Sequence, residues 1–179
     1  LEFRRVLFRS YGGLWAVVAP MMAALHKVGP AQAGLIGLPG AAGILVARPA
    51  GRWMDRAGSV PVVSTGVCVM IAAWLAFGFA AFSVAFVALG AILLDCGLRT
   101  AMVANQTLIN AAVPESRARA NSIFGIHVWG GNATGALLTS TAFAMSGWLA
   151  VCAICLTASS TALLIHKGVI PVGRAKRFD

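Results

Sequence analysis

The chain has 179 residues, of which 59% are hydrophobic and only 11% are charged, and its mean hydropathy is +0.85. A soluble domain carries about 25% charged and about 45–50% apolar residues, so this composition excludes an ordinary water-soluble fold and predicts a membrane protein. The net charge of +9 would favour nucleic-acid binding in a soluble protein. Here the basic residues separate hydrophobic runs and no nucleic-acid-reading motif accompanies them, so we expect no nucleic-acid partner.

The opening segment, residues 1–10, reads LEFRRVLFRS. It places three arginines among apolar residues and has no cleavage site, which is unlike a signal peptide. It resembles a translated cloning or sequencing-adapter remnant. We therefore interpret 1–10 as a non-native leader and leave it out of the fold prediction.

Six hydrophobic stretches follow in chain order. A spanning helix needs about 20 apolar residues, because the hydrocarbon core is about 30 Å thick and the helix rises about 1.5 Å per residue. We predict an all-α, polytopic membrane protein whose bundle occupies 11–167, followed by a basic tail over 168–179. The predicted spanning helices are 11–25, 31–50, 61–81, 83–104, 120–145 and 148–165.

Basic residues are distributed unevenly between the two sides of the predicted bundle. The segments on one side carry Arg4, Arg5, Arg9, Arg52, Arg56, Arg117, Arg119, Lys167, Arg174, Lys176 and Arg177. The opposite connections carry only His26 and Lys27. Because cytoplasmic loops hold an excess of Lys and Arg, both ends of the chain are predicted to be cytoplasmic.

Small residues recur at helix-packing spacings on two of the predicted helices. They are Gly34, Gly37, Gly40 and Gly43 on the second helix, and Gly131 and Gly135 on the fifth. Lipid supplies no hydrophobic drive for helix association, so small residues that let two backbones approach are expected at helix contacts. The second helix also contains Pro39 and Pro49, which are expected to kink it.

Two charged residues interrupt the fourth predicted helix. Asp95 and Arg99 are four residues apart, so they share a helix face and can pair. A charged side chain near the bilayer centre costs roughly 2.5–3.5 kcal/mol, so both are expected to face the bundle interior. Two interpretations stay open: Asp95 takes part in proton coupling or substrate binding with Arg99 as its partner, or the two form a structural ion pair near the cytoplasmic end of the helix.

Other polar and aromatic residues give weaker signals. His127, on the fifth helix, is a candidate for transport or coupling because histidine is a common proton carrier in proteins, and a packed or hydrogen-bonded histidine is the alternative. Trp15 is a candidate for lining a cavity. Cys152 and Cys155 form a C-x-x-C, but within a lipid-embedded helix they are interpreted as small packing residues. No nucleotide-binding glycine loop, catalytic triad or metal-ligand cluster is present, so we expect no enzyme, no cofactor and no metal.

The segment between the second and third helices carries the most specific motif. Residues 51–58 read GRWMDRAG, and this resembles the G-x-x-x-D-R-x-G loop of the major facilitator superfamily. The match rests on Gly51, Asp55, Arg56 and Gly58, with Arg52 as a further basic residue. Residues 59–60 depart from the basic continuation usual in the family, which is more typical of the copy in the second half. In the family this loop holds helices in one of two alternating-access states.

The resemblance covers nearly all of the chain after residue 10. The segment 29–35, GPAQAGL, is similar to the external turn before the eighth helix of bacterial drug- and sugar-efflux members, and 93–106 is similar to their tenth helix. The resemblance implies six helices that form the C-terminal half, helices seven to twelve, of a transporter in the bacterial inner membrane. It implies proton-coupled efflux of a small organic solute, with a missing N-terminal half as partner. The alternative is a self-contained six-helix channel or structural subunit.

Overall fold

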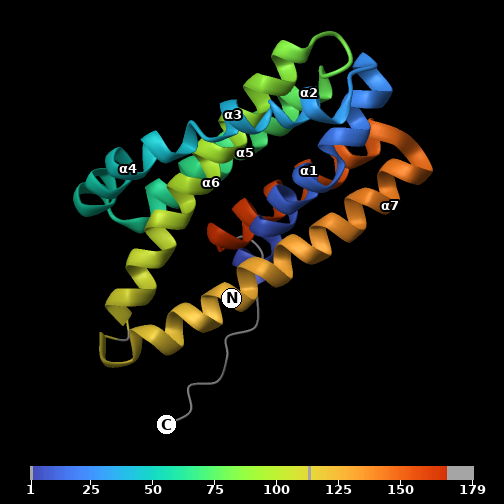
Figure 1. Cartoon of the computed structure of the whole chain (residues 1–179). Helices are drawn as coiled ribbons and strands as arrows, with labels where there is room; N and C mark the ends of the chain where they lie inside the picture. Colours follow the sequence, from blue (N-terminus) through green and yellow to red (C-terminus); the bar gives the residue numbers. More distant parts are fainter. Residues whose placement is uncertain (1, 113, 169–179) are drawn as a thin grey trace.

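The computed structural model describes residues 2–112 and 114–168, and every regular element in these ranges is helical. The long helices are α1 (Glu2–His26), α5 (Ser59–Gly78), α6 (Val84–Ala112) and α7 (Arg117–His166) (Figure 1). Three shorter helices follow almost end to end between α1 and α5: α2 (Pro30–Gly34), α3 (Gly37–Gly40) and α4 (Gly43–Ala57). A 3-10 turn, η1 (Pro114–Ser116), precedes α7.

Four segments of the described chain are long and apolar enough to span a membrane: Pro30–Ala57, Ser59–Gly78, Val84–Ala111 and Ala118–His166. The last is part of a 50-residue element, which at about 1.5 Å per residue is far longer than a hydrocarbon core of about 30 Å. Non-helical backbone angles at Gly147 divide α7 into two arms, 117–146 and 148–166, and Figure 1 shows the second arm running back alongside the first. These arms correspond to the fifth and sixth predicted helices.

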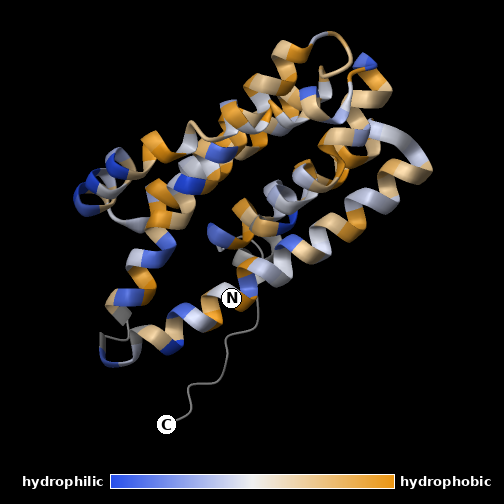
Figure 2. Ribbon diagram, in the orientation of Figure 1, coloured by the Kyte–Doolittle hydropathy of each residue, from blue (hydrophilic) through white to orange (hydrophobic). Residues whose placement is uncertain are grey.

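The connections alternate between the two ends of the bundle. Figure 1 shows the α4–α5 and α6–α7 connections at one end, with the α1–α2 connection, the α5–α6 connection and the Gly147 bend at the other. Arg52, Arg56 and Arg119 are exposed at the first end, and Lys27 is exposed at the second. Figure 2 shows the same pattern, with hydrophobic residues along the helices and hydrophilic ones gathered near the turns.

Several predicted boundaries are wrong by a turn or more. Helix α1 begins at Glu2, so it includes most of 1–10, and α6 continues to Ala112 rather than ending near 104. Polarity alone does not end a helix, because the amide of Asn105 is satisfied by the carbonyl of Ala101 one turn earlier. Pro114, which cannot continue an α-helical hydrogen-bond ladder, follows soon after the end of α6.

The second predicted helix is interrupted and also extended. Short i→i+3 hydrogen bonds replace the regular ladder around Pro39, such as Leu38 N to Leu35 O at 3.0 Å and Ala42 N to Pro39 O at 3.0 Å. Pro49, in contrast, lies inside the continuous helix α4. Because α4 reaches Ala57, residues 51–57 of the predicted loop are helical, and Gly58 alone separates α4 from α5.

Two pairs of long helices make the most extensive contacts: α1 packs along α7, and α5 packs along α6. Glycines allow the close approach in both pairs. A Cβ added at Gly97 would lie 2.6 Å from the carbonyl oxygen of Gly66, and one added at Gly66 would lie 2.7 Å from that of Gly97. On α1, a Cβ at Gly12 would lie 2.6 Å from the backbone of Asn132. At these points the backbones of the two helices are in direct contact, so no residue larger than glycine fits.

The close contact between α5 and α6 predicts a large effect of one methyl group. We expect Gly97→Ala to lower the free energy of unfolding by about 1–3 kcal/mol, because overpacking forces two helix backbones apart. Gly130→Ala on α7 is the matched control, since a Cβ there meets nothing within 4 Å and alanine favours the helix. Thermal denaturation in detergent measures both variants, and equal melting temperatures for the two would contradict the close contact.

Two turns depend on backbone angles that only glycine adopts readily. Gly58 has φ 79° and ψ 179°, and Gly147 has φ 75° and ψ −165°. After the Gly147 bend, Trp148 donates a hydrogen bond from Nε1 to the carbonyl oxygen of Phe77 at 2.7 Å. The rings of Trp74, Phe77 and Trp148 pack with centroids 5.1–6.4 Å apart. The second arm of α7 is thereby fixed to the end of α5.

Substitution at the α7 bend tests this arrangement. Gly147→Ala is expected to destabilise the protein by about 1–3 kcal/mol, because a side chain strains this backbone conformation. The measurement is the melting temperature, with Gly125→Ala in the helical part of α7 as control. A Gly147→Ala protein that melts like the parent would mean that the two arms do not require the bend.

Candidate functional site

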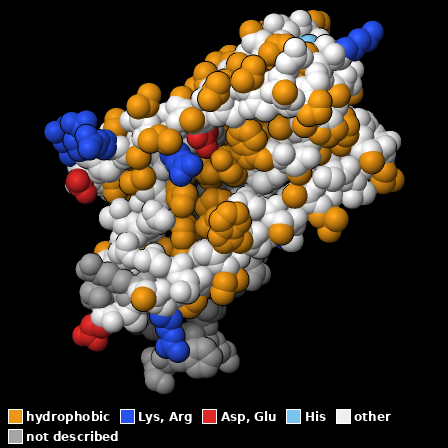
Figure 3. Space-filling view, in the orientation of Figure 1, with side chains coloured by type: hydrophobic (Ala, Val, Ile, Leu, Met, Phe, Trp, Pro, Cys, Tyr) orange, Lys and Arg blue, Asp and Glu red, His pale blue; other side chains and the backbone are white. Residues whose placement is uncertain are grey.

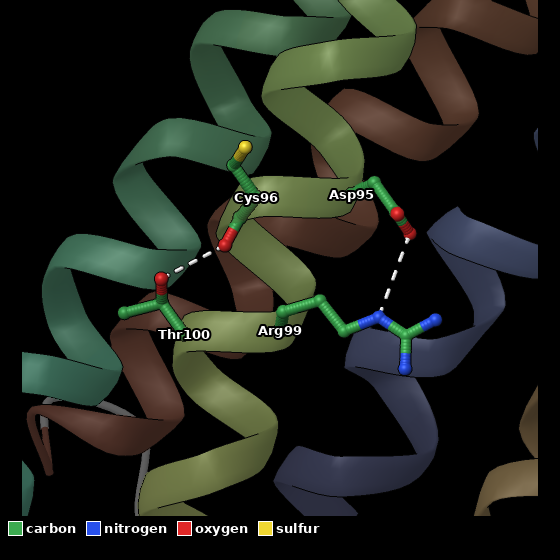
Figure 4. Close-up of polar contacts among 4 residues, drawn as sticks. All are labelled: Asp95, Cys96, Arg99 and Thr100. Carbon is green, nitrogen blue, oxygen red and sulfur yellow. Dashed lines mark hydrogen bonds and ion pairs between the residues drawn. The ribbon is translucent and has the colours of Figure 1, made fainter. Parts of the chain in front are cut away.

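Asp95 and Arg99 lie on either side of the midpoint of α6, residue 98. Arg99 Nε is 3.9 Å from Asp95 Oδ1, and the Asp95 side chain is 5% exposed whereas that of Arg99 is 41% exposed. Both side chains extend from α6 toward α1, and Thr100 on another face donates to the Cys96 carbonyl at 2.8 Å (Figure 4). The pair therefore lies near mid-helix and not near a helix end.

Two glycines one turn apart, Gly40 on α3 and Gly43 on α4, allow this segment to pack closely against Trp15 and Asp95. A Cβ added at Gly43 would lie 2.7 Å from Asp95 Oδ2 and 2.9 Å from the Asp95 carbonyl oxygen. A Cβ added at Gly40 would lie 3.2 Å from the Trp15 ring. Both glycines are buried. The backbone of this segment thus lies directly against the carboxyl group of α6 and the indole of α1.

Helix α1 contributes two aromatic rings on one face. Tyr11 and Trp15 are four residues apart and pack edge to face, with centroids 6.2 Å apart. Tyr11 also interacts electrostatically with Asp95 and Arg99. Four buried polar atoms in this region have no hydrogen-bond partner within the described part of the chain: Trp15 Nε1, Asp95 Oδ1, Arg99 Nε and Asn132 Oδ1.

Two grooves lie along α7 and share Trp129. The aromatic groove, about 430 Å³, runs between α1 and α7 and is lined by Tyr11, Gly12, Trp15, Ala16, Trp129, Asn132, Ala133 and Ala136. The amide groove, about 510 Å³, lies between α6 and α7 and is lined by Met102, Gln106, Asn110, Asn121, Phe124, Gly125, Val128 and Trp129. Figure 3 shows a hollow on the face in view, with hydrophobic side chains on its floor.

Sequence reasoning singled out Trp15 and missed the groove formed around it. A signal was available on α7, because Trp129, Asn132, Ala133 and Ala136 recur at spacings of three, four and seven residues and so share one helix face. Pairing that face with Tyr11 and Trp15 requires knowledge of which helices are neighbours. The sequence does not contain that information directly.

His127 lies apart from the charged pair. It is buried on α7, and its Nδ1 is 2.7 Å from the carbonyl oxygen of Ile123 one turn earlier. Among the described residues, no hydrogen bond or ion pair joins it to Asp95 or Arg99. This contact is the one expected if His127 is a packed or hydrogen-bonded residue. A role of His127 in transport stays a proposal.

Residues 51–58 at the end of α4, which carry the G-x-x-x-D-R-x-G motif, are largely exposed. Arg52, Asp55 and Arg56 are exposed, and Gly51 is half-buried. Within the described ranges, no ion pair within 4.0 Å connects Asp55 to either arginine. Gly58 supplies the turn through its positive φ. These charges are therefore available for contacts beyond the described chain.

The glycines predicted to pack helices occupy different environments. Gly40, Gly43 and Gly135 make close contacts, the last against the backbone of Arg9 on α1, and Gly131 is buried. A Cβ at Gly34 or Gly37 would meet nothing within 4 Å. In the turn before α2, Gly29 N donates to Gln32 Oε1 at 3.2 Å, with Pro30 at the first helical position.

Metal-binding chemistry finds no support in the described residues. No group of three or more His, Cys, Asp or Glu side chains lies close enough there to hold a metal ion. Cys152 and Cys155 are buried free thiols on the second arm of α7. Their surroundings are those of packed core residues.

Comparisons with known proteins agree with this architecture. The chain is 32% identical over 159 residues to YgaY of Escherichia coli, named as an uncharacterized transporter, which covers 88% of this chain and 40% of the relative. It is 30% identical over 150 residues to a Streptomyces coelicolor protein named as a probable transporter, covering 83% of this chain and 35% of the relative. The chain thus spans about two fifths of the length of these relatives.

The family comparison extends over almost the whole chain. The Major Facilitator Superfamily model matches residues 6–177. The matched range includes the helices that carry Asp95, the two grooves and the 51–58 motif. The chain belongs to the major facilitator superfamily of membrane transport proteins.

Proposed function

We propose that the complete protein is a proton-coupled secondary transporter that exports a small organic solute across the bacterial inner membrane. This chain supplies the second six-helix half, with both of its ends cytoplasmic, and a missing first half supplies the opposite wall of the cavity. Transporters built from two such halves bind solute near the bilayer midplane and alternate access by rocking one half against the other. Export is the direction that the resemblance to efflux members implies.

The observation that carries the proposal is the buried carboxyl group of Asp95 at the middle of α6. A charge at this depth is costly, roughly 2.5–3.5 kcal/mol on insertion scales, and intramembrane carboxyl groups commonly mark proton or substrate pathways. The contact with Arg99 at 3.9 Å offsets part of this cost but is too long for a hydrogen bond. A purely structural ion pair would be expected to form a closer, hydrogen-bonded contact.

Two states of Asp95 then follow. When the carboxyl group is ionised, it is held by the positive charge of Arg99. When it takes up a proton, its attraction to Arg99 is lost, so the side chains of α6, α1 and α4 can rearrange around it. Uptake of the proton from the outside and its release to the cytoplasm would couple the proton gradient to this rearrangement. His127 remains a weaker candidate for a second coupling residue.

The exposed charges at the end of α4 fit the same scheme. Arg52, Asp55 and Arg56 have no ion-pair partner within the described chain. In the family, this segment holds helices together in one alternating-access state. We infer that their partners lie on helices that pack against this end in the complete protein, so that the contact forms in one state and breaks in the other.

Neutralising Asp95 tests the coupling. In the complete transporter reconstituted in proteoliposomes, Asp95→Asn is expected to abolish solute accumulation driven by a pH gradient, because the amide cannot carry a proton. Exchange of labelled for unlabelled solute needs no net proton movement, and it should persist and lose its pH dependence. The measurement is radiolabelled solute flux with and without a pH gradient.

The matched control is Glu115→Gln, which removes an exposed carboxyl group in the turn before α7. It should leave gradient-driven accumulation unchanged. Normal proton-driven transport by Asp95→Asn would refute the coupling role and leave only the structural ion pair.

The half-transporter assignment makes a separate prediction. The purified chain alone should show no solute flux in proteoliposomes, because it supplies one wall of the cavity. Co-expression with the first half as a separate polypeptide should restore flux if the two halves associate. Flux by the chain alone would instead support the alternative of a self-contained channel or carrier.

A further inference from the structure

We propose that this half binds a flat aromatic solute that carries uncharged hydrogen-bonding groups, and that the solute lies in the aromatic groove between α1 and α7. The inference rests on the transport function proposed above and adds the chemical class of the solute. It is drawn from the shape of the groove, its unpaired polar atoms and the absence of formal charge among its lining residues.

The shape of the groove suits a planar ring. Tyr11, Trp15 and Trp129 provide three aromatic side chains, and the remaining apolar lining consists of glycine and alanine, which project little into the space. Trp129 is 74% exposed, so its indole face is open to a partner. Aromatic rings favour offset-stacked or edge-to-face contacts with one another. A ring of one or two fused cycles fits a groove of about 430 Å³.

Two polar atoms of the lining residues require partners of opposite kinds. The indole Nε1 of Trp15 is a donor only, and Oδ1 of Asn132 is an acceptor. Both are buried and make no hydrogen bond of good geometry within the described chain, although the Trp15 side chain also interacts with the hydroxyl group of Tyr11. Buried polar groups in proteins are nearly always hydrogen-bonded. A solute that places one acceptor and one donor at the edge of its ring would satisfy both atoms, as an aromatic amide does.

The charge of the site favours an uncharged solute. None of the residues that line the aromatic or the amide groove is charged. The nearby acidic group, Asp95, is 3% exposed and faces Arg99, so it is not available to a cation in the groove. A charged solute would give up its hydration without gaining a counter-charge from the residues that line the groove, since the half-exposed Arg99 is not among them. In the amide groove, which shares Trp129 with the aromatic groove, the polar side chains are also neutral amides: Gln106, Asn110 and Asn121.

A binding experiment tests the solute class without any ion gradient. The complete transporter is placed in lipid nanodiscs, and scintillation-proximity binding is measured with radiolabelled coumarin, indole and quinoline carboxamides. Each is compared with the same ring carrying a trimethylammonium or a carboxylate group. At least one carboxamide is expected to bind about tenfold more tightly than both of its charged counterparts.

Variants at the two unpaired atoms assign the binding to the groove. Trp15→Phe keeps an aromatic ring but removes the N–H, and Asn132→Ala removes the acceptor. Each is expected to weaken carboxamide binding by about tenfold, the effect of one lost hydrogen bond. Trp53→Phe, on an exposed tryptophan of α4 outside both grooves, should leave the affinity unchanged. Melting temperatures measured in parallel show whether each variant folds.

Three results would overturn the inference. The first is that no carboxamide binds, and the second is that a charged counterpart binds as tightly as its carboxamide. The third is that the folded Trp15→Phe and Asn132→Ala variants keep full affinity, which would place these atoms against the missing half. Carboxamide binding without proton-driven flux would refute only the proposed coupling, whereas proton-driven flux without carboxamide preference would refute only this inference.

Discussion

A carboxylate and a guanidinium at the middle of a spanning helix must both be kept away from lipid, and the neighbouring helices bury the carboxylate. Helix α1 lies on the side toward which both side chains extend. The segment α3–α4 covers Asp95 so closely that only glycine fits at position 43. Arg99 stays half-exposed within this chain. The least lipid-compatible residues of the chain therefore determine which faces of three helices point inward.

Close contacts between helix backbones also join the long helices into two pairs, α5 with α6 and α1 with α7. The two pairs meet at Asp95 and Arg99. Glycine contacts bring α5 against α6 at Gly66 and Gly97, and α1 against α7 at Gly12. The charged pair lies where the α6 side faces the α1 side. Because lipid offers no hydrophobic drive for helix association, such backbone contacts carry much of the cohesion. A change in the charge of Asp95 would thus act at the junction between two internally tight helix pairs.

Much of this fold could be predicted from the sequence, because hydropathy and helix length are one-dimensional properties. The four segments that are long and apolar enough to span a membrane, the burial of Asp95 and the turn at Gly58 follow from local patterns, whereas the first predicted helix is not among those four segments and Arg99 is half-exposed. Helix ends were less predictable, since α6 continues through Asn105 by satisfying its amide on its own backbone. The grooves were not predictable, because they require Asn132 of α7 to lie beside Trp15 of α1. That neighbour relation is set by glycine contacts between distant parts of the chain.

The polar atoms left without partners within the described chain fit the proposed transport function better than they fit an ordinary helical bundle. In a bundle that serves only as a scaffold, Trp15 Nε1 and Asn132 Oδ1 would be replaced by apolar groups or paired with each other at little cost. Here their residues line one groove, and one oxygen of the Asp95 carboxyl group is also without a hydrogen-bond partner within the described chain. A membrane protein that kept every polar group permanently satisfied would have one stable arrangement. In the proposed transporter, incomplete pairing would keep the free energies of different arrangements close, so that a solute, a proton or the opposite half would decide between them.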